Sequence, residues 1–180
     1  MKTVRVASGD ELVAIYDESG AVTGSAPRRV MRAEGLWHAS TAILLRSTDG
    51  DRVYVHKRSD SKDINPGRHD CWAGGVVDAG EDPAVCAERE LAEELGVSGV
   101  PLRHLFTLPF VVPPVRAHQY AYEAFSDAPV THQPEEVVSG EWMTFTELSE
   151  RLDDPDWPFV DDGRALIQHW FQTESGNNGG

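Results

Sequence analysis

The sequence has few cysteines. Cys71 and Cys86 are the two in 180 residues, and neither is part of a CxxC or CxxH spacing. Disulfide-bonded folds depend on several cysteines, and zinc sites depend on cysteines or histidines at close spacing. The sequence therefore disfavours both and predicts reduced thiols, as in a cytoplasmic protein.

Basic residues are also scarce. Lysine and arginine number 16 against 30 acidic residues, which gives a formal net charge of -14. One modest basic cluster occurs, between His56 and Arg68, whereas nucleic-acid-binding proteins carry extended basic surfaces. We therefore expect no nucleic-acid partner. An acidic protein can still bind phosphates when a bound metal ion reverses the local charge.

Long apolar runs are missing as well. A membrane-spanning helix needs about 18 or more consecutive apolar residues, and the sequence has no such run. The first residues, MKTVRVASGDELV, lack the apolar centre of a signal peptide. We expect a cytoplasmic protein without a membrane partner.

Strand-like and helix-like segments alternate along the chain without an internal repeat. Segments typical of strands lie at 11–24 (two strands and a turn), 37–46, 52–58, 71–77, 102–112, 116–125 and 137–143. Segments typical of helices lie at 25–35, 82–96, 145–152 and 163–173, and a polar loop lies at 59–70. This irregular order predicts an α/β or α+β sandwich with a mixed sheet. We expect one domain over residues 1–172 and a disordered tail over residues 173–180.

The most informative segment is GGVVDAGEDPAVCAERELAEELGV, from Gly74 to Val97. Asp82 is a suitable N-cap residue, Pro83 suits the first helical position, and Gly96 suits the C-cap. The segment therefore predicts a loop with a glycine pair followed by a helix between these caps.

Three acids, Glu90, Glu93 and Glu94, crowd the end of this helix. They lie along the edge of the apolar stripe that faces the core, rather than on the opposite, solvated side. Half-shielded carboxylates this close together must be protonated, paired or metal-bound. Their oxygen atoms suit Mg²⁺ or Mn²⁺. The alternative is a solvated face with a salt bridge to Arg89.

The same segment resembles the signature of the Nudix hydrolases. Gly75, Glu81 and the run from Arg89 to Val97 match the Nudix box, GX5EX7REUXEEXGU, at every defined position. The order of strands from Glu11 to Leu152 is also similar to that of the Nudix fold. The resemblance implies an α/β/α sandwich with a mixed sheet. It also implies a hydrolase that cleaves a phosphoanhydride bond in a nucleoside diphosphate linked to another group.

The resemblance further implies the roles of individual residues. Glu90 and Glu94 would be direct ligands of Mg²⁺ or Mn²⁺, with Glu93 beside them as a ligand and catalytic group. The carbonyl oxygen of Gly74 would be a further ligand. In this family the ion neutralises the diphosphate, stabilises charge on the leaving phosphate and lowers the pKa of a bound water.

Other positions of the motif would support this centre. Arg89 would orient a glutamate, and Glu81 would brace the loop. Gly74 and Gly75 would let the backbone approach the ion and the substrate closely, because glycine has no side chain.

The motif does not fix the general base. In HQPEEVVSGEW, Glu136 stands six residues before Trp142, where some Nudix hydrolases carry a loop glutamate that reaches the metal. Glu136 is therefore the candidate base, and Glu135 is the second choice. The alternative is that both are solvated loop acids.

Basic residues precede the glycine pair, in HKRSDSKDINPGRHD. Arginine offers a planar fork for phosphate and lysine offers a point charge. We therefore expect Arg58 and Lys62 to bind substrate phosphates. The alternative is a solvated loop that balances the acidic surface.

Two other functions belong to related proteins. The hairpin IYDESGAVTG, the stretch KRSDSKD…PG and His38 resemble the branch that holds isopentenyl-diphosphate isomerases and their hydrolase relatives. The isomerases need a cysteine and a histidine where Gly74 and Gly75 stand here, and Cys71 comes too early. A non-catalytic nucleotide sensor is the other alternative, although such modules often lose the box carboxylates that are kept here. We therefore expect a hydrolase with a small-molecule diphosphate substrate, and the family resemblance is compatible with a homodimer.

Overall fold

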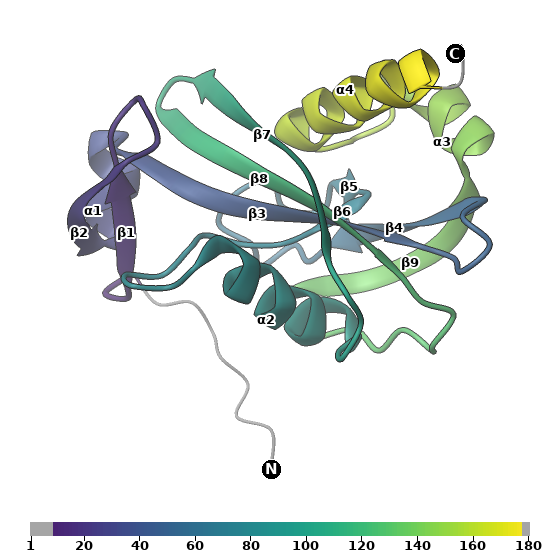
Figure 1. Ribbon diagram of the computed structural model, residues 1–180, viewed down its shortest axis with the longest axis horizontal. Coiled ribbons are helices and arrows are strands. Elements are labelled where there is room, and N and C mark those ends of the chain that lie inside the picture. Colours follow the sequence, from purple (N-terminus) through teal and green to yellow (C-terminus); the bar gives the residue numbers. More distant parts are fainter. Residues whose placement is uncertain (1–8, 178–180) are drawn as a thin grey trace.

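The computed structural model describes residues 9–177. Its strands are β1 Leu12–Tyr16, β2 Val22–Pro27, β3 Trp37–Arg46, β4 Arg52–Arg58, β5 His69–Asp70, β6 Trp72–Ala73, β7 Arg103–Val112, β8 Val115–Phe125 and β9 Val137–Thr144. Its helices are α1 Arg28–Glu34, α2 Pro83–Leu95, α3 Phe145–Leu152 and α4 Asp161–Asn177. The described strands form one sheet, with α2 on one face and α3 and α4 on the other (Figure 1). This is the predicted α/β/α sandwich.

The sheet is mixed, as predicted. Strand β3 lies at its centre and pairs in parallel with β8, from Trp37 opposite Arg116 to Arg46 opposite Phe125. The other pairings within the described strands are antiparallel, including β3 with β4 and β4 with β9. The parallel pairing of β3 with β8 brings together residues about eighty positions apart in the sequence.

Strand β3 is buried on both faces because both faces carry helices. Leu44 packs into a core with Ile167 and Trp170 of α4. Its neighbours Ile43 and Leu45 point to the opposite face and pack against Leu91 and other residues of α2. Alternation along one apolar strand thus anchors both helical layers to the sheet.

Helix α2 has the predicted ends. The Asp82 carboxylate accepts a hydrogen bond from the backbone N–H of Ala84 at 2.8 Å, and Pro83 occupies the first turn. Gly96 ends the helix with a left-handed backbone, φ 69°. These caps fix where the helix starts and ends, and therefore which residues meet the sheet.

Three details differ from the sequence prediction or fall outside it. Segment 59–70, predicted as loop, contains β5, a two-residue strand whose polar sequence gives no strand signal. Helix α4 continues to Asn177, although disorder was predicted from residue 173; between Arg164 and Ser175 it contains no proline or glycine. Residues 1–8 of the predicted domain and 178–180 of the predicted tail lie outside the described residues. No helix of the described chain is long and apolar enough to cross a membrane.

Candidate active site

The glycine pair lies against β3. The backbone N–H of Thr41 donates to the carbonyl oxygen of Gly75 at 2.9 Å. A side chain at Gly74 would overlap the carbonyl oxygen of Thr41. Gly74 also has a positive φ of 156°, so glycine is required here by both space and backbone conformation.

The same two glycines contact the acidic end of α2. The backbone N–H of Gly74 donates to Oε2 of Glu94 at 3.0 Å. A Cβ atom at Gly75 would lie 2.5 Å from Oε1 of Glu90. The absence of side chains therefore lets the Glu90 and Glu94 carboxylates approach the loop backbone.

Arg89 connects several acids of the motif. Its Nε and Nη2 atoms donate to the two carboxylate oxygens of Glu81, each at 2.9 Å. Its Nη1 atom donates to Glu90 at 2.6 Å and to Glu93 at 3.4 Å. Glu81 in turn accepts the backbone N–H of Asp78 at 3.1 Å, which ties the helix to the loop before it.

The carboxylates at the centre of this group are short of compensating charge. Burial, with the Glu94 charge as the second cause, raises the pKa of Glu90 to about 7. Burial also raises the pKa of Glu94, against the opposing effects of Lys62 and Arg58. Glu94 is 3 % exposed. Carboxylates that burial and mutual repulsion make hard to ionise are stabilised by a cation.

The glycine pair and the acidic end of α2 line one small cavity of about 50 Å³. The lining includes the predicted metal, base and phosphate residues Gly74, Gly75, Arg89, Glu90, Glu93, Glu94, Lys62 and Glu136. Glu136 comes from the loop before β9, and its carboxylate forms an ion pair with Lys62. Glu135, the second choice for the base, is exposed and does not line this cavity. Glu81 stays behind Arg89, in keeping with a bracing role.

The residues present are compatible with a hard divalent cation, which prefers oxygen ligands. Within the described chain, no three His, Cys, Asp or Glu side chains converge closely enough to hold a metal ion. Instead, Glu90 contacts Arg89, Glu94 contacts the Gly74 N–H, and Glu136 contacts Lys62. These partners are cationic groups and an N–H donor, so the oxygen-rich cavity attracts positive charge already.

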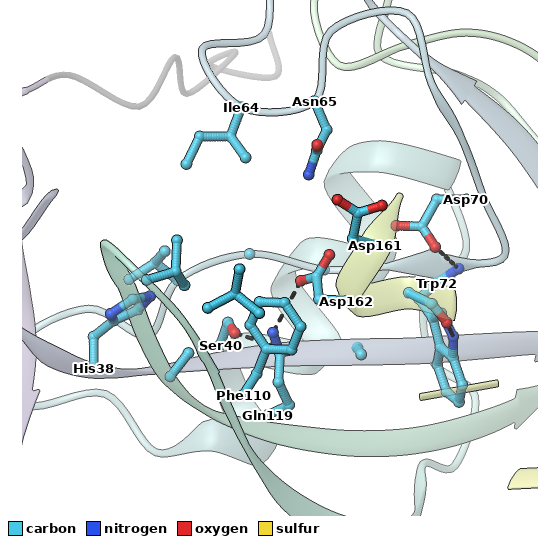
Figure 2. A pocket seen from close by; sticks show the side chains of 18 of the residues that line it. His38, Ser40, Ile64, Asn65, Asp70, Trp72, Phe110, Gln119, Asp161 and Asp162 are labelled. Atoms are coloured by element: carbon cyan, nitrogen blue, oxygen red, sulfur yellow. Dashed lines mark hydrogen bonds between the residues drawn. The ribbon is translucent and has the colours of Figure 1, made fainter. Parts of the chain in front are cut away.

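A larger cavity, of about 340 Å³, adjoins the small one. Both are lined by Arg28, Lys62, Gly74, Gly75 and Val76, so the glycine pair forms part of the wall of each. Figure 2 shows side chains from distant segments converging in the larger cavity, among them His38, Asp70, Gln119 and Asp162. A volume of this size lies within the range of about 300–1,000 Å³ that is typical of small-molecule sites.

The two predicted phosphate-binding residues differ in their surroundings. Lys62 lines both cavities, and burial lowers its pKa. Arg58 lines the larger cavity alone, and it donates to the carbonyl oxygens of Asn65 at 3.2 Å and Ile64 at 2.9 Å. Arg58 therefore also holds the 59–68 loop in shape.

Three further cavity residues escaped the sequence analysis. Arg28 and Arg32 come from α1 and line the larger cavity, and Arg28 also lines the small one. Gln133 lines the small cavity, and its Nε2 atom is buried without a hydrogen-bond partner among the described residues. The basic run that begins α1 is the one signal that could have suggested the arginines, while Gln133 gives none.

Cys71 and His38, the residues that bear on an isomerase function, lie outside the small cavity. Cys71 is buried in the core on the α4 side and lines neither cavity. His38 lines the larger cavity, and its Nδ1 atom contacts the carbonyl oxygen of Leu36 at 3.1 Å. Burial lowers the pKa of His38.

Comparison with known proteins identifies relatives over most of the chain. The model of the NUDIX domain matches residues 36–163. An uncharacterized Nudix hydrolase, orf19 of Rhodococcus erythropolis, is 48% identical over 167 residues, which cover 88% of this chain and 90% of that protein. The uncharacterized Nudix hydrolase YfcD of Escherichia coli K12 is 33% identical, over 98% of this chain and 95% of its own length.

Solved structures show the same fold. The crystal structure of DR0079 from Deinococcus radiodurans matches with a TM-score of 0.73 and 25% identity, over 88% of this chain and 98% of that one. The NUDIX domain of Shewanella oneidensis NrtR, solved in complex with ADP ribose, matches with a TM-score of 0.61 and 19% identity. That match covers 76% of this chain and 88% of the other.

Proposed function

This chain belongs to the Nudix hydrolase family, and we propose that it cleaves the diphosphate of a nucleoside diphosphate linked to a second group. Nudix proteins are hydrolases that act on phosphoanhydride bonds and generally use divalent metal cations. The observation that carries the proposal is the group of crowded, buried carboxylates, Glu90 and Glu94, beside the Gly74–Gly75 backbone.

Two neighbouring cavities support the proposed class of substrate. The small cavity suits the diphosphate and its counter-ion, and the larger one suits an organic group attached to that diphosphate. The NrtR NUDIX domain was solved with ADP ribose, which is a nucleoside diphosphate carrying a second sugar. That complex supports the same class for this chain.

Glu90, Glu93, Glu94 and the carbonyl oxygen of Gly74 would hold Mg²⁺ or Mn²⁺. Bound there, such an ion neutralises diphosphate oxygens and lowers the pKa of a water that it binds. Arg89 keeps Glu90 oriented through the hydrogen bond of 2.6 Å, and Glu81 keeps Arg89 in place.

Lys62 and Glu136 would act together on substrate and water. An incoming phosphate offers Lys62 a stronger anionic partner, so the Lys62 ammonium turns from Glu136 to a phosphate oxygen. The released Glu136 carboxylate then accepts the proton of the water that attacks phosphorus. Arg28, which lines both cavities, would bind an oxygen of the same diphosphate. A homodimer and a cytoplasmic location stay predictions of the sequence.

Hydrolysis with Glu94→Gln and Glu88→Gln variants tests the proposal. Glu88 lies on the same helix but is exposed and lines neither cavity of the site, so Glu88→Gln is the matched control. We expect wild type and Glu88→Gln to cleave at least one nucleoside diphosphate conjugate with Mg²⁺ or Mn²⁺ and none with EDTA. Glu94→Gln should fold normally and lose about a hundredfold or more in kcat.

Isotope labelling tests the bond that breaks. Cleavage of the diphosphate yields two organic monophosphates. In water enriched in oxygen-18, attack on phosphorus incorporates the label into the phosphate group of one of them, and no label becomes bound to carbon. Label bound to carbon in either product, or full activity of Glu94→Gln, would contradict the proposed mechanism.

A further inference from the structure

The larger cavity is lined by side chains of both charges. Its cationic residues are Arg28, Arg32, Arg58 and Lys62, two of which also border the small cavity. Among its acidic residues, Asp63 pairs with Arg32 at 3.2 Å. The others, Asp70, Asp161 and Asp162, form an acidic wall, which Figure 2 shows near Trp72, on the opposite side of the view from His38. The negative charge of a diphosphate complements the cationic residues, whereas the acidic wall would repel it and must contact a different part of the substrate.

A hydrogen-bond chain leads into this acidic wall. Because β3 and β8 run parallel in register, Ser40 stands opposite Gln119. The Ser40 hydroxyl donates to Oε1 of Gln119 at 2.9 Å, and Nε2 of Gln119 donates to Oδ2 of Asp162 at 2.9 Å (Figure 2). Gln119 is 4% exposed, so both ends of its amide are fixed by these partners.

The direction of the hydrogen bonds from Ser40 through Gln119 determines whether Asp162 acts as a donor or an acceptor. Gln119 presents its N–H group to the Asp162 carboxyl, so Asp162 acts as a hydrogen-bond acceptor. The chain therefore ends, at the cavity, in a carboxylate that is oriented by buried neighbours rather than by solvent. An oriented acceptor at a cavity wall selects for donors.

Asp70 stands beside the end of this chain. Its Oδ1 atom accepts the backbone N–H of Trp72 at 3.1 Å. A Cβ at Gly163 would lie 2.5 Å from the same oxygen, so the start of α4 packs directly against the Asp70 carboxyl. Burial raises the pKa of Asp70 well above its usual range, with the Asp162 charge as the second cause, and burial also raises the pKa of Asp162. An N–H donor between Asp70 and Asp162 would stabilise their ionised forms and so lower the pKa of both carboxyls.

We propose that the larger cavity binds the organic group attached to the diphosphate, and that Asp162, oriented by Gln119 and Ser40, accepts a hydrogen bond from an N–H donor of that group. This inference rests on the proposed function, because it concerns the same substrate. The donor is either the amino-bearing edge of a nucleobase or a primary ammonium group. Asp162 is thus a specificity-determining residue, and Gln119 is its positioning residue.

Symmetrical diphosphates give a test in which either end of the substrate presents the same group. Diguanosine diphosphate is compared with its inosine counterpart, which lacks only the exocyclic amino groups. A diphosphate with an aminoethyl group on each side is compared with its hydroxyethyl counterpart. We expect the amino-bearing member of one pair to be favoured about tenfold or more in kcat/KM, and the pair that shows it identifies the source of the donor.

Asp162→Asn and Gln119→Leu test the residues. Replacing the carboxylate with an amide adds a donor where the substrate also donates, so Asp162→Asn should abolish the preference while metal-dependent cleavage continues. Gln119→Leu should weaken the preference by releasing Asp162. Asp156→Asn is the control, because it removes the same charge at an exposed position that lines neither cavity. It should keep the preference. Thermal unfolding checks that each variant folds.

Binding of the same compounds, measured by titration calorimetry with and without Mg²⁺, gives a readout that does not require turnover. Equal affinity and equal kcat/KM within both pairs would overturn the inference while leaving the hydrolase standing. An unchanged preference in Asp162→Asn, or an equal loss in Asp156→Asn, would also overturn it. No cleavage of any diphosphate would instead count against the proposed function, and the binding ratios would still decide the inference.

Discussion

Arg89 donates two parallel hydrogen bonds to Glu81, Nε to Oε1 and Nη2 to Oε2, each 2.9 Å long. The hydrogen bonds to Glu81 are the main reason that the pKa of Arg89 is raised. Because Glu81 lies in the loop and Arg89 on α2, this pair fixes the helix relative to the loop. The same guanidinium then reaches Glu90, so the position of a proposed metal ligand depends on Glu81.

Arg89→Lys should therefore weaken both the fold and the site. Lysine keeps the charge but cannot form the paired hydrogen bonds. We expect a loss of about 1–3 kcal/mol in the free energy of unfolding, measured by urea denaturation, together with a lower kcat. Arg116→Lys, at an exposed position of β8, is the control and should change neither quantity. Wild-type stability and activity in Arg89→Lys would show that the geometry of the pair is unimportant.

The two glycines should respond differently to alanine. At Gly74 the added methyl group meets the backbone oxygen of Thr41 and a positive φ, so Gly74→Ala should destabilise the fold severely. At Gly75 it meets the end of the flexible Glu90 side chain, at 2.5 Å. Gly75→Ala should therefore fold, with the carboxylate displaced and kcat reduced about tenfold or more.

Gly24→Ala is the matched control for both glycine variants, because nothing lies within 4 Å of its added methyl group. Thermal unfolding and steady-state kinetics of the three variants separate the two effects. A stable Gly74→Ala variant would contradict the close approach to Thr41, and a fully active Gly75→Ala variant would contradict the role of Glu90.

Lys62 should matter more for activity than for stability. It pairs with Glu136 and lines both cavities. Lys62→Met keeps much of the side-chain length and removes the charge, so we expect kcat/KM to fall about tenfold or more. Lys57→Met, on β4 and outside both cavities, should retain wild-type kinetics. Equal kinetics in the two variants would exclude Lys62 from phosphate binding.

His56 should make the protein less stable in acid. It is 1% exposed, and burial lowers its pKa from 6.5 to about 3, with nearby Arg58, His132, Lys62 and His69 adding to the effect. The unfolded chain therefore binds a proton at a pH where the folded chain does not, and stability falls as the pH drops below 6.5. The loss should reach about 2 kcal/mol at about pH 5.

Urea denaturation of wild type and His56→Gln across this pH range measures the effect. Asp70, whose pKa is raised, contributes in the opposite sense in both proteins. The difference between the two curves therefore isolates His56. Parallel pH dependences would show that His56 does not titrate in this way.

Local features were predictable from the sequence because local chemistry determines them. Strand β3 has the predicted bounds, Trp37–Arg46, since its apolar run is continuous. Helix α2 begins and ends where Asp82 and Gly96 indicated, since caps satisfy the free backbone groups of a helix. The Nudix motif predicted the family, and the comparisons with known proteins confirmed it.

The walls of the larger cavity were not predictable, because they depend on contacts between distant segments. Gln119 meets Ser40 through the parallel pairing of β3 with β8, and it meets Asp162 through the packing of α4 on the sheet. Neither contact is indicated by the local sequence around the residues that form it. Arg28 escaped for the same reason, since α1 reaches the site through the fold rather than through a motif.

The Gly74–Gly75 backbone forms part of the walls of two adjoining cavities. On one side are the carboxylates of α2, and on the other are side chains supplied by β8 and the start of α4. With the roles proposed above, substitutions on the second side would exchange one substrate for another without disturbing the groups proposed to break the diphosphate.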